Sequence, residues 1–372
     1  MHTHTRARVA ALLVLVVVAA TWAQAPKPDA ESIGSTRNAR VAYPMHGEKA
    51  PLTFLAGELS EQEIAQLKAA APNVTVLHGL TREQALERAG EANGVDARFA
   101  TPAFLAKAKS LVWVQAMSAG VDHLIANKAL VENDRIVLTN MRAVHAPAIA
   151  DHAMAMLLTL TRGLPFYAAQ QVKGHWNDDA PAAPLPRPTA LAGKTMLVVG
   201  IGGIGTEIAQ RAHGFGMRVI ATRRSDTPGP AYVERVGKPE DLLKMLPEAD
   251  VVAVCVPLTS ETEHLFDAKA FAAMKPGSYL INIARGRIVD TEALIAALES
   301  GKLAGACLDV TDPEPLPDGH ELWGMKNVVI TPHVASEAEL TTERRWALFK
   351  ENIRRFGAGE PLLNCVDKKA GY

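Results

Sequence analysis

Three unlike side chains in the last third of the sequence could together act on a 2-keto acid. Arg285 lies in the stretch Asn282–Gly286, Glu314 lies between two prolines, and His333 follows Thr331-Pro332. A guanidinium can hold a carboxylate through paired hydrogen bonds, and an imidazole can give a proton to a carbonyl oxygen near neutral pH. A carboxylate that bonds the imidazole orients it and favours its charged form. We therefore predict that these three residues form a catalytic site.

A glycine-rich loop upstream has the build of a dinucleotide site. The motif Gly200-Ile201-Gly202-Gly203-Ile204-Gly205 follows the apolar run Thr195–Val199 and precedes a helical pattern over Ile204–Phe215. After a strand, such glycines permit a tight turn, let the backbone approach a pyrophosphate, and let the helix pack on the strand. The residues that we predict to bind the cofactor here are Gly200, Gly202, Gly203, Ile204 and Gly205.

The choice between the two nicotinamide cofactors depends on the end of the next strand, at Thr222. An NAD site usually places an acidic residue there to bind the ribose hydroxyls. This sequence instead has Arg223, Arg224 and Ser225, which would attract a 2′-phosphate. We therefore predict that these three residues bind the cofactor, that NADP(H) is preferred, and that NAD(H) is the alternative.

The apolar runs from residue 195 onward predict a parallel sheet, because runs that are apolar on both faces alternate with helical patterns. The strands predicted after Thr195–Val199 are Arg218–Thr222, Val251–Val256, Tyr279–Ala284, Ala304–Asp309 and Val328–Thr331, with helices at Asp241–Leu246 and Thr291–Ser300. Alone, each catalytic candidate could be an ordinary ion pair, a solvated turn or a loop residue. Together they follow the carboxyl ends of strands, where such sheets bind ligands, and this favours catalysis.

A second, smaller α/β domain is predicted before this block. Its strands are Leu52–Leu55, Val74–Leu77, Val112–Gln115 and Ile136–Thr139, with a helix at Glu61–Ala70. A long apolar helix at Ala146–Leu160 is suited to join the two domains, and the helix at Glu343–Phe356 is expected to return to the smaller one. The proline-rich stretch Ala180–Pro188 is interpreted as a loop, because proline fixes φ and removes amide donors.

The expected fold class is therefore α/β, with two Rossmann-like doubly wound domains and a cleft between them. We place a flavodoxin-like substrate domain at residues 40–142 and 335–372, and a dinucleotide-binding domain at residues 143–334.

Composition excludes some function classes. The 372 residues are 48% hydrophobic with a formal net charge of −1, which supports globular domains and gives no electrostatic case for a nucleic-acid partner. Arg344-Arg345 and Arg354-Arg355 fall in a helical pattern and are interpreted as a solvated face. His145 and His152 could share a helix face, but no third ligand is near in sequence, so no metal site is expected.

The N-terminus has the build of a secretory signal peptide at residues 1–25. Arg6 and Arg8 precede an unbroken apolar run from Val9 to Ala20, followed by Ala23-Gln24-Ala25. The run is shorter than the about twenty residues that cross a bilayer, which favours cleavage and no stable membrane insertion. We expect an exported protein; a membrane-anchored or cytoplasmic protein is the alternative. Export conflicts with the use of a cytoplasmic nicotinamide cofactor.

Several stretches resemble the D-isomer-specific 2-hydroxyacid dehydrogenase family, over about Phe54 to Tyr372. They are Leu191–Thr195, Val256–Thr259, Asn282–Gly286, Leu308–Val310, Glu314–Pro317 and Thr331–His333. In that family the arginine binds the substrate, the histidine is the acid/base and the glutamate supports it, so the resemblance assigns these roles to Arg285, His333 and Glu314. The formate-oxidising relatives carry glutamine at the position of Glu314, which disfavours that activity.

The resemblance also implies roles outside the triad. In Met117–Asp122 the backbone amides of Ser118, Ala119 and Gly120 would hold the substrate carboxylate. Asp309 would lie near the nicotinamide carboxamide, and Pro257, Ile283 and Ala284 would line the cofactor cleft. The sequence departs from the family at Asp151, where glutamate is usual, and at the arginines that replace the NAD-selecting aspartate.

The sequence thus predicts a 2-keto acid reductase that prefers NADPH and that could run in reverse as a D-2-hydroxyacid dehydrogenase. Its partner would be a small 2-keto or 2-hydroxy acid, and a homodimer is expected. The alternative is a non-turnover NAD(P)(H)-binding or sensing protein of the same fold, although a pure binder has no need of a histidine/carboxylate pair.

Overall fold

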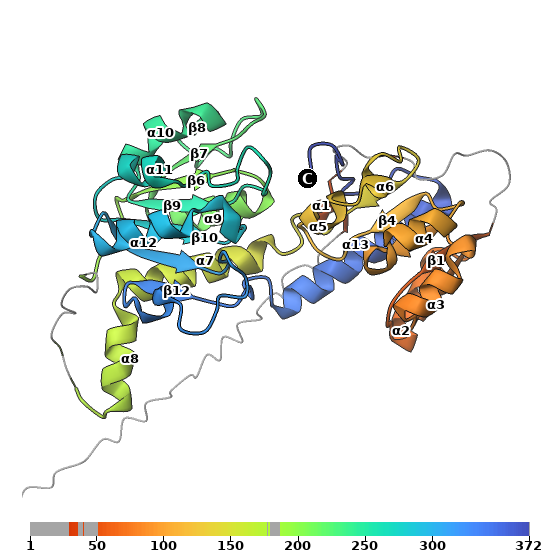
Figure 1. The fold of residues 1–372 in the computed structure, drawn as a ribbon, viewed down its shortest axis with the longest axis horizontal. Helices are drawn as coiled ribbons and strands as arrows, with labels where there is room; N and C mark the ends of the chain where they lie inside the picture. Colours follow the sequence, from red (N-terminus) through yellow and green to blue (C-terminus); the bar gives the residue numbers. More distant parts are fainter. Residues whose placement is uncertain (1–29, 36–39, 41–50, 177, 179–186, 372) are drawn as a thin grey trace, which may run out of the picture.

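Continuous apolar runs build two parallel sheets, one in each of two domains (Figure 1). The computed structural model describes residues 30–35, 40, 51–176, 178 and 187–371. The predicted signal peptide lies outside these residues and stays a prediction, and residues 180–186 of the proline-rich stretch lie outside them too. No helix in the described ranges is long and apolar enough to span a membrane.

The smaller domain contains a five-stranded sheet in the order β2-β1-β3-β4-β5. All of its strand pairs are parallel, and this order is the flavodoxin-like one that the sequence predicted. The sequence did not predict β3, which is three residues long. The strands are β1 Leu52–Leu55, β2 Val74–Leu77, β3 Gly94–Asp96, β4 Trp113–Gln115 and β5 Val137–Thr139, and the helices are α2 Glu61–Ala70, α3 Arg82–Glu87, α4 Pro102–Lys107, α5 Asp122–Ile125 and α6 Lys128–Val131.

The larger domain contains a seven-stranded parallel sheet in the order β12-β11-β10-β9-β6-β7-β8. The order reverses at β6, as in a doubly wound dinucleotide-binding sheet, so the expected fold class is confirmed. The short edge strand β8 was not predicted. The strands are β6 Thr195–Val199, β7 Arg218–Thr222, β8 Arg235–Gly237, β9 Val251–Val254, β10 Ser278–Asn282, β11 Leu303–Leu308 and β12 Val328–Ile330, and the helices are α9 Gly203–Gly214, α10 Leu242–Met245, α11 Ala268–Ala273 and α12 Thr291–Glu299.

Both faces of the larger sheet are buried, because successive side chains of each strand point to opposite sides. On β6, Met196 and Val198 join a core with α7 (Ala146–Thr161) and α9, whereas Leu197 and Val199 join a core with α11 and α12. This double coverage explains why the strands have unbroken apolar runs instead of alternation.

Helix α13 (Glu339–Ala358) follows the last strand of the larger sheet and packs on the smaller domain (Figure 1). Its Phe349 ring lies 5.5 Å from that of Phe54, and its Phe356 ring lies 5.0 Å from that of Trp113. The chain therefore crosses between the domains twice, through α7 and through α13. The remaining described helices are α1 Ala30–Ile33 and α8 Leu164–Val172, with short 3-10 turns elsewhere.

The prediction that the arginines of α13 form a solvated face was wrong for three of the four. Arg344 donates to the carbonyl oxygens of Val144 and Ala143, and Arg355 is 9% exposed and bonds Glu351. Arg345 is half-buried at the cleft between the domains. The helix is covered by the smaller domain on one side and by the segment that precedes α7 on another, which its sequence pattern does not reveal.

Two glycines of α9 give a matched test of the packing between helix and loop. A Cβ at Gly205 would overlap the carbonyl oxygen of Gly200, whereas a Cβ at Gly214 would have no neighbour within 4 Å. We expect Gly205→Ala to lower the Tm by about 3 to 10 °C, from an overpacking cost of about 1 to 3 kcal/mol. Gly214→Ala should leave the Tm unchanged or raise it, because alanine favours the helix. Equal Tm values for both variants would contradict the close packing at Gly205.

Candidate active site

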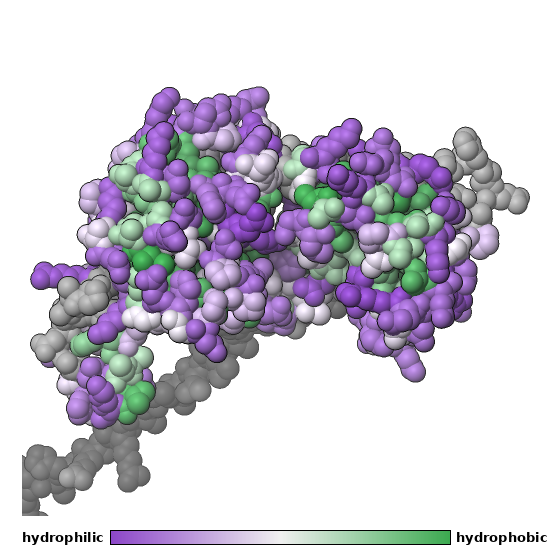
Figure 2. Space-filling model, in the orientation of Figure 1, coloured by the Kyte–Doolittle hydropathy of each residue, from purple (hydrophilic) through white to green (hydrophobic). Residues whose placement is uncertain are grey.

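A cavity of about 380 Å³ lies between the two domains. From the smaller domain it is lined by the loops after β4 and β5; from the larger, by the glycine loop and by residues after β9, β10, β11 and β12. These segments meet because the carboxyl ends of parallel strands share one edge of a sheet. Figure 2 shows the hollow between the domains, with hydrophilic residues along its rim.

His333 and Glu314 form a hydrogen-bonded pair at this cleft. The imidazole Nδ1 lies 2.7 Å from Glu314 Oε1, and the side chains are 46% and 41% exposed. An ionised carboxylate can only accept, so Nδ1–H donates to it. The other ring nitrogen, Nε2, is then left for a ligand in the cavity, which His333 lines.

The buried carboxylate of Asp309 fixes the turn that carries His333. Asp309 is 3% exposed, and its oxygens accept from the Thr331 hydroxyl at 2.6 Å and from the amides of Val334 and Ala335 at 3.0 and 3.2 Å. Within this turn His333 adopts a φ of +55°, which is rare for residues other than glycine. Asp309 therefore compensates the strained conformation that aims the imidazole. Its role near the nicotinamide stays a prediction, although it lines the cavity.

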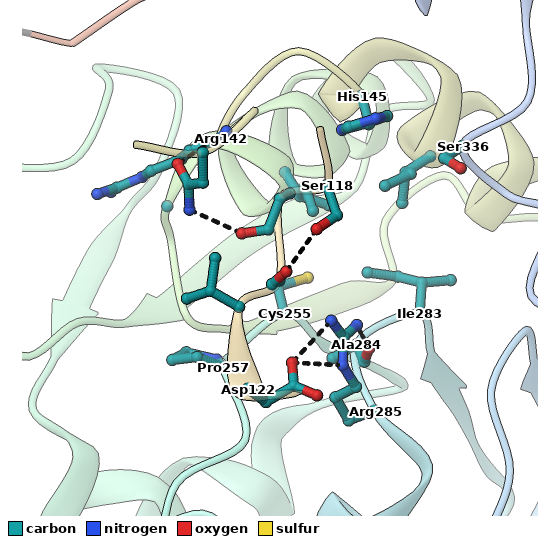
Figure 3. A pocket seen from close by; sticks show the side chains of 18 of the residues that line it. Ser118, Asp122, Arg142, His145, Cys255, Pro257, Ile283, Ala284, Arg285 and Ser336 are labelled. Atoms are coloured by element: carbon teal, nitrogen blue, oxygen red, sulfur yellow. Dashed lines mark hydrogen bonds and ion pairs between the residues drawn. The ribbon is translucent and has the colours of Figure 1, made fainter. Parts of the chain in front are cut away.

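Arg285 already holds a carboxylate, that of Asp122 from the opposite domain (Figure 3). Its Nε and Nη2 donate to Asp122 Oδ1 at 3.2 and 3.1 Å, and its Nη1 donates to the carbonyl of Ala284 at 2.7 Å. Burial raises the pKa of Asp122, but the charge and hydrogen bonds of Arg285 outweigh this, so that pKa lies below its ordinary value. The pair shows that a carboxylate fits this guanidinium, and Asp122 stands where an acid ligand would compete.

The substrate loop presents unused backbone donors beside Arg285. The carbonyls of Ser118, Ala119 and Gly120 accept hydrogen bonds from Met141 N, Asn140 Nδ2 and Ser118 Oγ respectively. Within the described residues, the amides of these three loop residues have no hydrogen-bond partner. A Cβ at Gly120 would overlap Nη2 of Arg285, so a larger residue here would displace the guanidinium from its present position. The loop therefore offers amide donors next to a guanidinium, and their role in holding a substrate carboxylate stays a prediction.

The glycine loop fits a dinucleotide. Gly200 has a φ of +97°, and a Cβ there would press on Val256 and the backbone of Cys255. A Cβ at Gly202 would meet nothing within 4 Å, so the backbone faces open space in front of the α9 N-terminus. The first amides of a helix have no intrahelical acceptor and favour an anion. The arrangement thus suits a pyrophosphate.

Arg223 follows the end of β7 as predicted, but its guanidinium is engaged by the backbone. Nε and Nη2 donate to the carbonyl of Ile201 at 3.2 and 2.6 Å, and Nη1 donates to the carbonyls of Thr227 and Pro228. These bonds tie the glycine loop to the loop after β7. Arg224 forms a 3.8 Å ion pair with Glu261, and its side chain is 54% exposed. Arg223 therefore supports the loop, and Arg224 is the more accessible cation.

The predicted site residues fall into two groups. Those that line the cavity are Ser118, Ala119, Gly120, Gly202, Gly203, Ile204, Pro257, Ile283, Ala284, Arg285, Asp309 and His333. Glu314 reaches the cavity through His333. Those that lie away from its wall are Gly200, Gly205, Arg223, Arg224 and Ser225.

Sequence reasoning missed several polar residues of the cavity wall, namely Asp122, Asn140, Arg142, His145 and Arg345. Asp122 was within reach, because it belongs to the quoted loop Met117–Asp122. The sequence could not predict that Arg345 lines the cavity, because the residues of its own helix do not indicate what packs against it. In the described part of the chain, no group of three or more His, Cys, Asp or Glu residues could hold a metal ion.

Comparisons with known proteins agree with this geometry. Residues 154–335 match the family model described as D-isomer specific 2-hydroxyacid dehydrogenase, NAD binding domain. The chain is 38% identical to a glyoxylate reductase of Thermococcus litoralis over 71% of this chain and 79% of that protein. The structure is also similar to that of a D-isomer specific 2-hydroxyacid dehydrogenase family protein from Aeromonas salmonicida. The TM-score is 0.73 at 35% identity, and the match covers 86% of this chain and 100% of that chain.

A further solved structure is similar, that of an NADPH-dependent glyoxylate/hydroxypyruvate reductase from Sinorhizobium meliloti in complex with NADP and sulfate. Its TM-score is 0.70 at 28% identity, covering 86% of this chain and 100% of that chain.

The hydrogen bonds of Asp309 predict a large loss of stability on neutralisation. We expect Asp309→Asn to lower the free energy of unfolding by about 1 to 3 kcal/mol, because the Ala335 N–H now donates to both carboxylate oxygens and would face the new amide nitrogen at either position. Asp122→Asn removes the same charge from a side chain that is 41% exposed, and should cost less than about 1 kcal/mol. Urea unfolding of the two variants measures this difference. Similar losses in both would mean that Asp309 does not hold the turn.

Proposed function

The chain belongs to the D-isomer specific 2-hydroxyacid dehydrogenase family, and on that premise we propose that it reduces small 2-keto acids to D-2-hydroxy acids with NADPH as the preferred hydride donor. The family and the relatives are oxidoreductases that act on CH–OH groups with a nicotinamide cofactor. A glyoxylate reductase and a glyoxylate/hydroxypyruvate reductase are among the relatives, which supports a substrate with a short side chain.

One observation carries the proposal: a carboxylate-binding guanidinium and a carboxylate-supported imidazole face the same cavity. Asp122 occupies Arg285 as the carboxylate of a 2-keto acid would, and His333 has a ring nitrogen free on the side away from Glu314. A substrate that binds Arg285 by its carboxylate presents its keto oxygen next to that carboxylate. This is the oxygen that needs a proton during reduction.

Different residues of the chain would then bind the substrate, stabilise the developing charge and deliver the proton. Substrate displaces Asp122 from Arg285, and the amides of Ser118–Gly120 bond the same carboxylate. Arg285 and protonated His333 stabilise the charge that develops on the keto oxygen, and His333 Nε2 delivers the proton. Glu314 keeps the imidazole oriented through its hydrogen bond to Nδ1. Closure of the two domains would exclude water from the cavity.

The cofactor, when bound, supplies the hydride that the keto carbon receives. The amides at the start of α9 would hold its pyrophosphate, and Pro257, Ile283 and Ala284 would line the nicotinamide part of the cleft. We assign the 2′-phosphate of NADPH to Arg224 and Ser225. Arg223 contributes by holding the loops on either side, since its donors already bond three carbonyls.

A non-turnover binding protein remains the second candidate from the sequence, but no contact in the described structure favours it. The pair of His333 and Glu314 has no function in dinucleotide binding alone. Oxidation of NADPH in the presence of glyoxylate or hydroxypyruvate separates the two functions. An enzyme oxidises NADPH with one of these acids, whereas a protein that only binds the cofactor does not.

His333 should be essential for turnover and dispensable for cofactor binding. We expect His333→Ala to lower kcat by about a hundredfold or more, the usual contribution of a positioned general acid. The Kd for NADPH, measured by its fluorescence, should change little. A variant that keeps more than half of its kcat would remove His333 from the mechanism.

The two arginines after β7 should differ in what they affect, although each substitution removes one charge. We expect Arg224→Gln to lower the NADPH over NADH preference in kcat/KM by about ten- to a hundredfold, the worth of a charge-assisted bond of about 1.5 to 3 kcal/mol. Arg223→Gln should weaken both cofactors alike, because it releases the glycine loop. An unchanged ratio in Arg224→Gln would place the 2′-phosphate elsewhere.

We also propose a homodimer that uses α8. No residue of α8 is buried, the helix projects from its domain, and Val172 and the nearby Trp176 are 89% and 98% exposed (Figure 1). Light scattering should give about twice the 39.8 kDa mass of the chain, and Val172→Asp should halve that value without lowering the Tm. A native mass near that of one chain at micromolar concentration would exclude the dimer.

A further inference from the structure

The cavity contains a second cation, to which no described residue gives an acidic partner. Arg345, near the start of α13, lines the same cavity as Arg285. Its Nη2 lies 3.2 Å from His145 Nε2, and its buried Nε has no hydrogen-bond partner within the described ranges. Among the residues that the structure describes, no carboxylate pairs with it. A buried charged donor without a partner is unfavourable, so this position is better satisfied by a ligand than by the protein alone.

His145 orients this guanidinium without neutralising it. Burial, and then the positive charge of Arg345, lower the pKa of His145 to about 4, so the imidazole is neutral near pH 7. A neutral imidazole has one acceptor nitrogen, and here Nε2 accepts from Arg345 while the ring also bonds the Met141 backbone. The pair is therefore a preorganised cation that keeps its full charge.

The wall around the pair carries more cationic than acidic groups. Its carboxylates are Asp122 and Asp309, within the described residues, and both are engaged: Asp122 by Arg285, and Asp309 by the turn of His333. Arg142 lies on the same wall. The potential in this part of the cavity favours an anion beyond the one that Arg285 holds.

Both ligand loops reach this part of the wall. A Cβ on Gly203 of the glycine loop would press on Ala143, and Met141 N donates to the carbonyl of Ser118 in the substrate loop at 2.9 Å. Figure 3 shows His145 on the side of the pocket opposite the Arg285–Asp122 pair. An anion here would thus belong to a ligand that extends across the cavity from one cation to the other.

We propose that Arg345, oriented by His145, is a second oxyanion-binding residue of this cleft. Its ligand is either the pyrophosphate of the dinucleotide or the second carboxylate of a dicarboxylic 2-keto acid. The subsite rests on the contacts above, whereas the identity of the two ligands rests on the proposed function.

The test uses the full-length protein and the variants Arg345→Gln and Arg345→Lys. Arg354→Gln is the matched control: it removes the same charge from α13, but Arg354 pairs with Glu351 and Glu360 outside the cavity. One arm measures the Kd of NADPH and of NADH by fluorescence. The other measures kcat/KM at saturating NADPH for 2-oxoglutarate against pyruvate, which differ in the second carboxylate.

We expect Arg345→Gln to weaken one ligand at least about tenfold, as loss of a charge-assisted bond does, and Arg354→Gln to change neither more than twofold. Equal losses for NADPH and NADH assign the pyrophosphate, and a loss confined to 2-oxoglutarate assigns the substrate carboxylate. Arg345→Lys keeps the charge and the aliphatic part of the side chain, so it should weaken the same ligand by a smaller factor. This variant replaces Arg345→Gln in the test if the glutamine variant does not fold.

Unchanged binding of both cofactors and of both keto acids in the folded Arg345 variants would overturn the proposal. The cofactor arm needs no turnover, and binding of 2-oxoglutarate can be followed by protein fluorescence. A native protein that reduces neither of these keto acids, nor glyoxylate or hydroxypyruvate, would contradict the proposed function, and the binding measurements would still decide the subsite.

Discussion

The active-site geometry depends on one buried carboxylate, that of Asp309. It stands at the end of β11 and accepts hydrogen bonds from the turn that follows β12, and thereby connects two adjacent strands at their carboxyl ends. The Thr331 hydroxyl that donates to it lies 2.9 Å from His152 Nε2 on α7, so the helix that joins the domains is part of the same network. Without these bonds, the left-handed backbone of His333 would have no compensation, and the imidazole would lose its direction.

The second constraint is electrostatic and spans the cleft. Arg285 from the larger domain and Asp122 from the smaller one are paired across the cavity. A ligand carboxylate therefore binds Arg285 only by displacing the carboxylate of Asp122. Exchange of one carboxylate for another keeps the charge of the site balanced. The geometry of Arg285 is also preserved, because Nη1 stays bonded to the carbonyl of Ala284. Binding thereby frees Asp122 from the contact that holds the two walls together.

The sequence predicted the elements that are determined by the residues of one segment, and missed those that depend on contacts between distant segments. Strands β6, β7 and β9 were found because they are buried on both faces and so have unbroken apolar runs. Strand β3 was missed since Gly94–Asp96 is too short to show a pattern, although it pairs with β1 and β4. The triad was found from residue type and position, but the bonds of Arg223 to backbone carbonyls depend on loops that only the fold brings together.

Helix α13 shows why the arginines were misjudged and what that position means for the site. The helix begins at the cleft and ends in the core of the smaller domain, so its first turns contact the segment before α7 while its later turns pack on β1 and β4. The position of a charged side chain in its first turns therefore depends on contacts with both domains. If the domains move relative to each other, Arg345 and His145 move with the smaller one, whereas the glycine loop moves with the larger. An anion bound between them would favour the closed arrangement, because only there can both sides reach it.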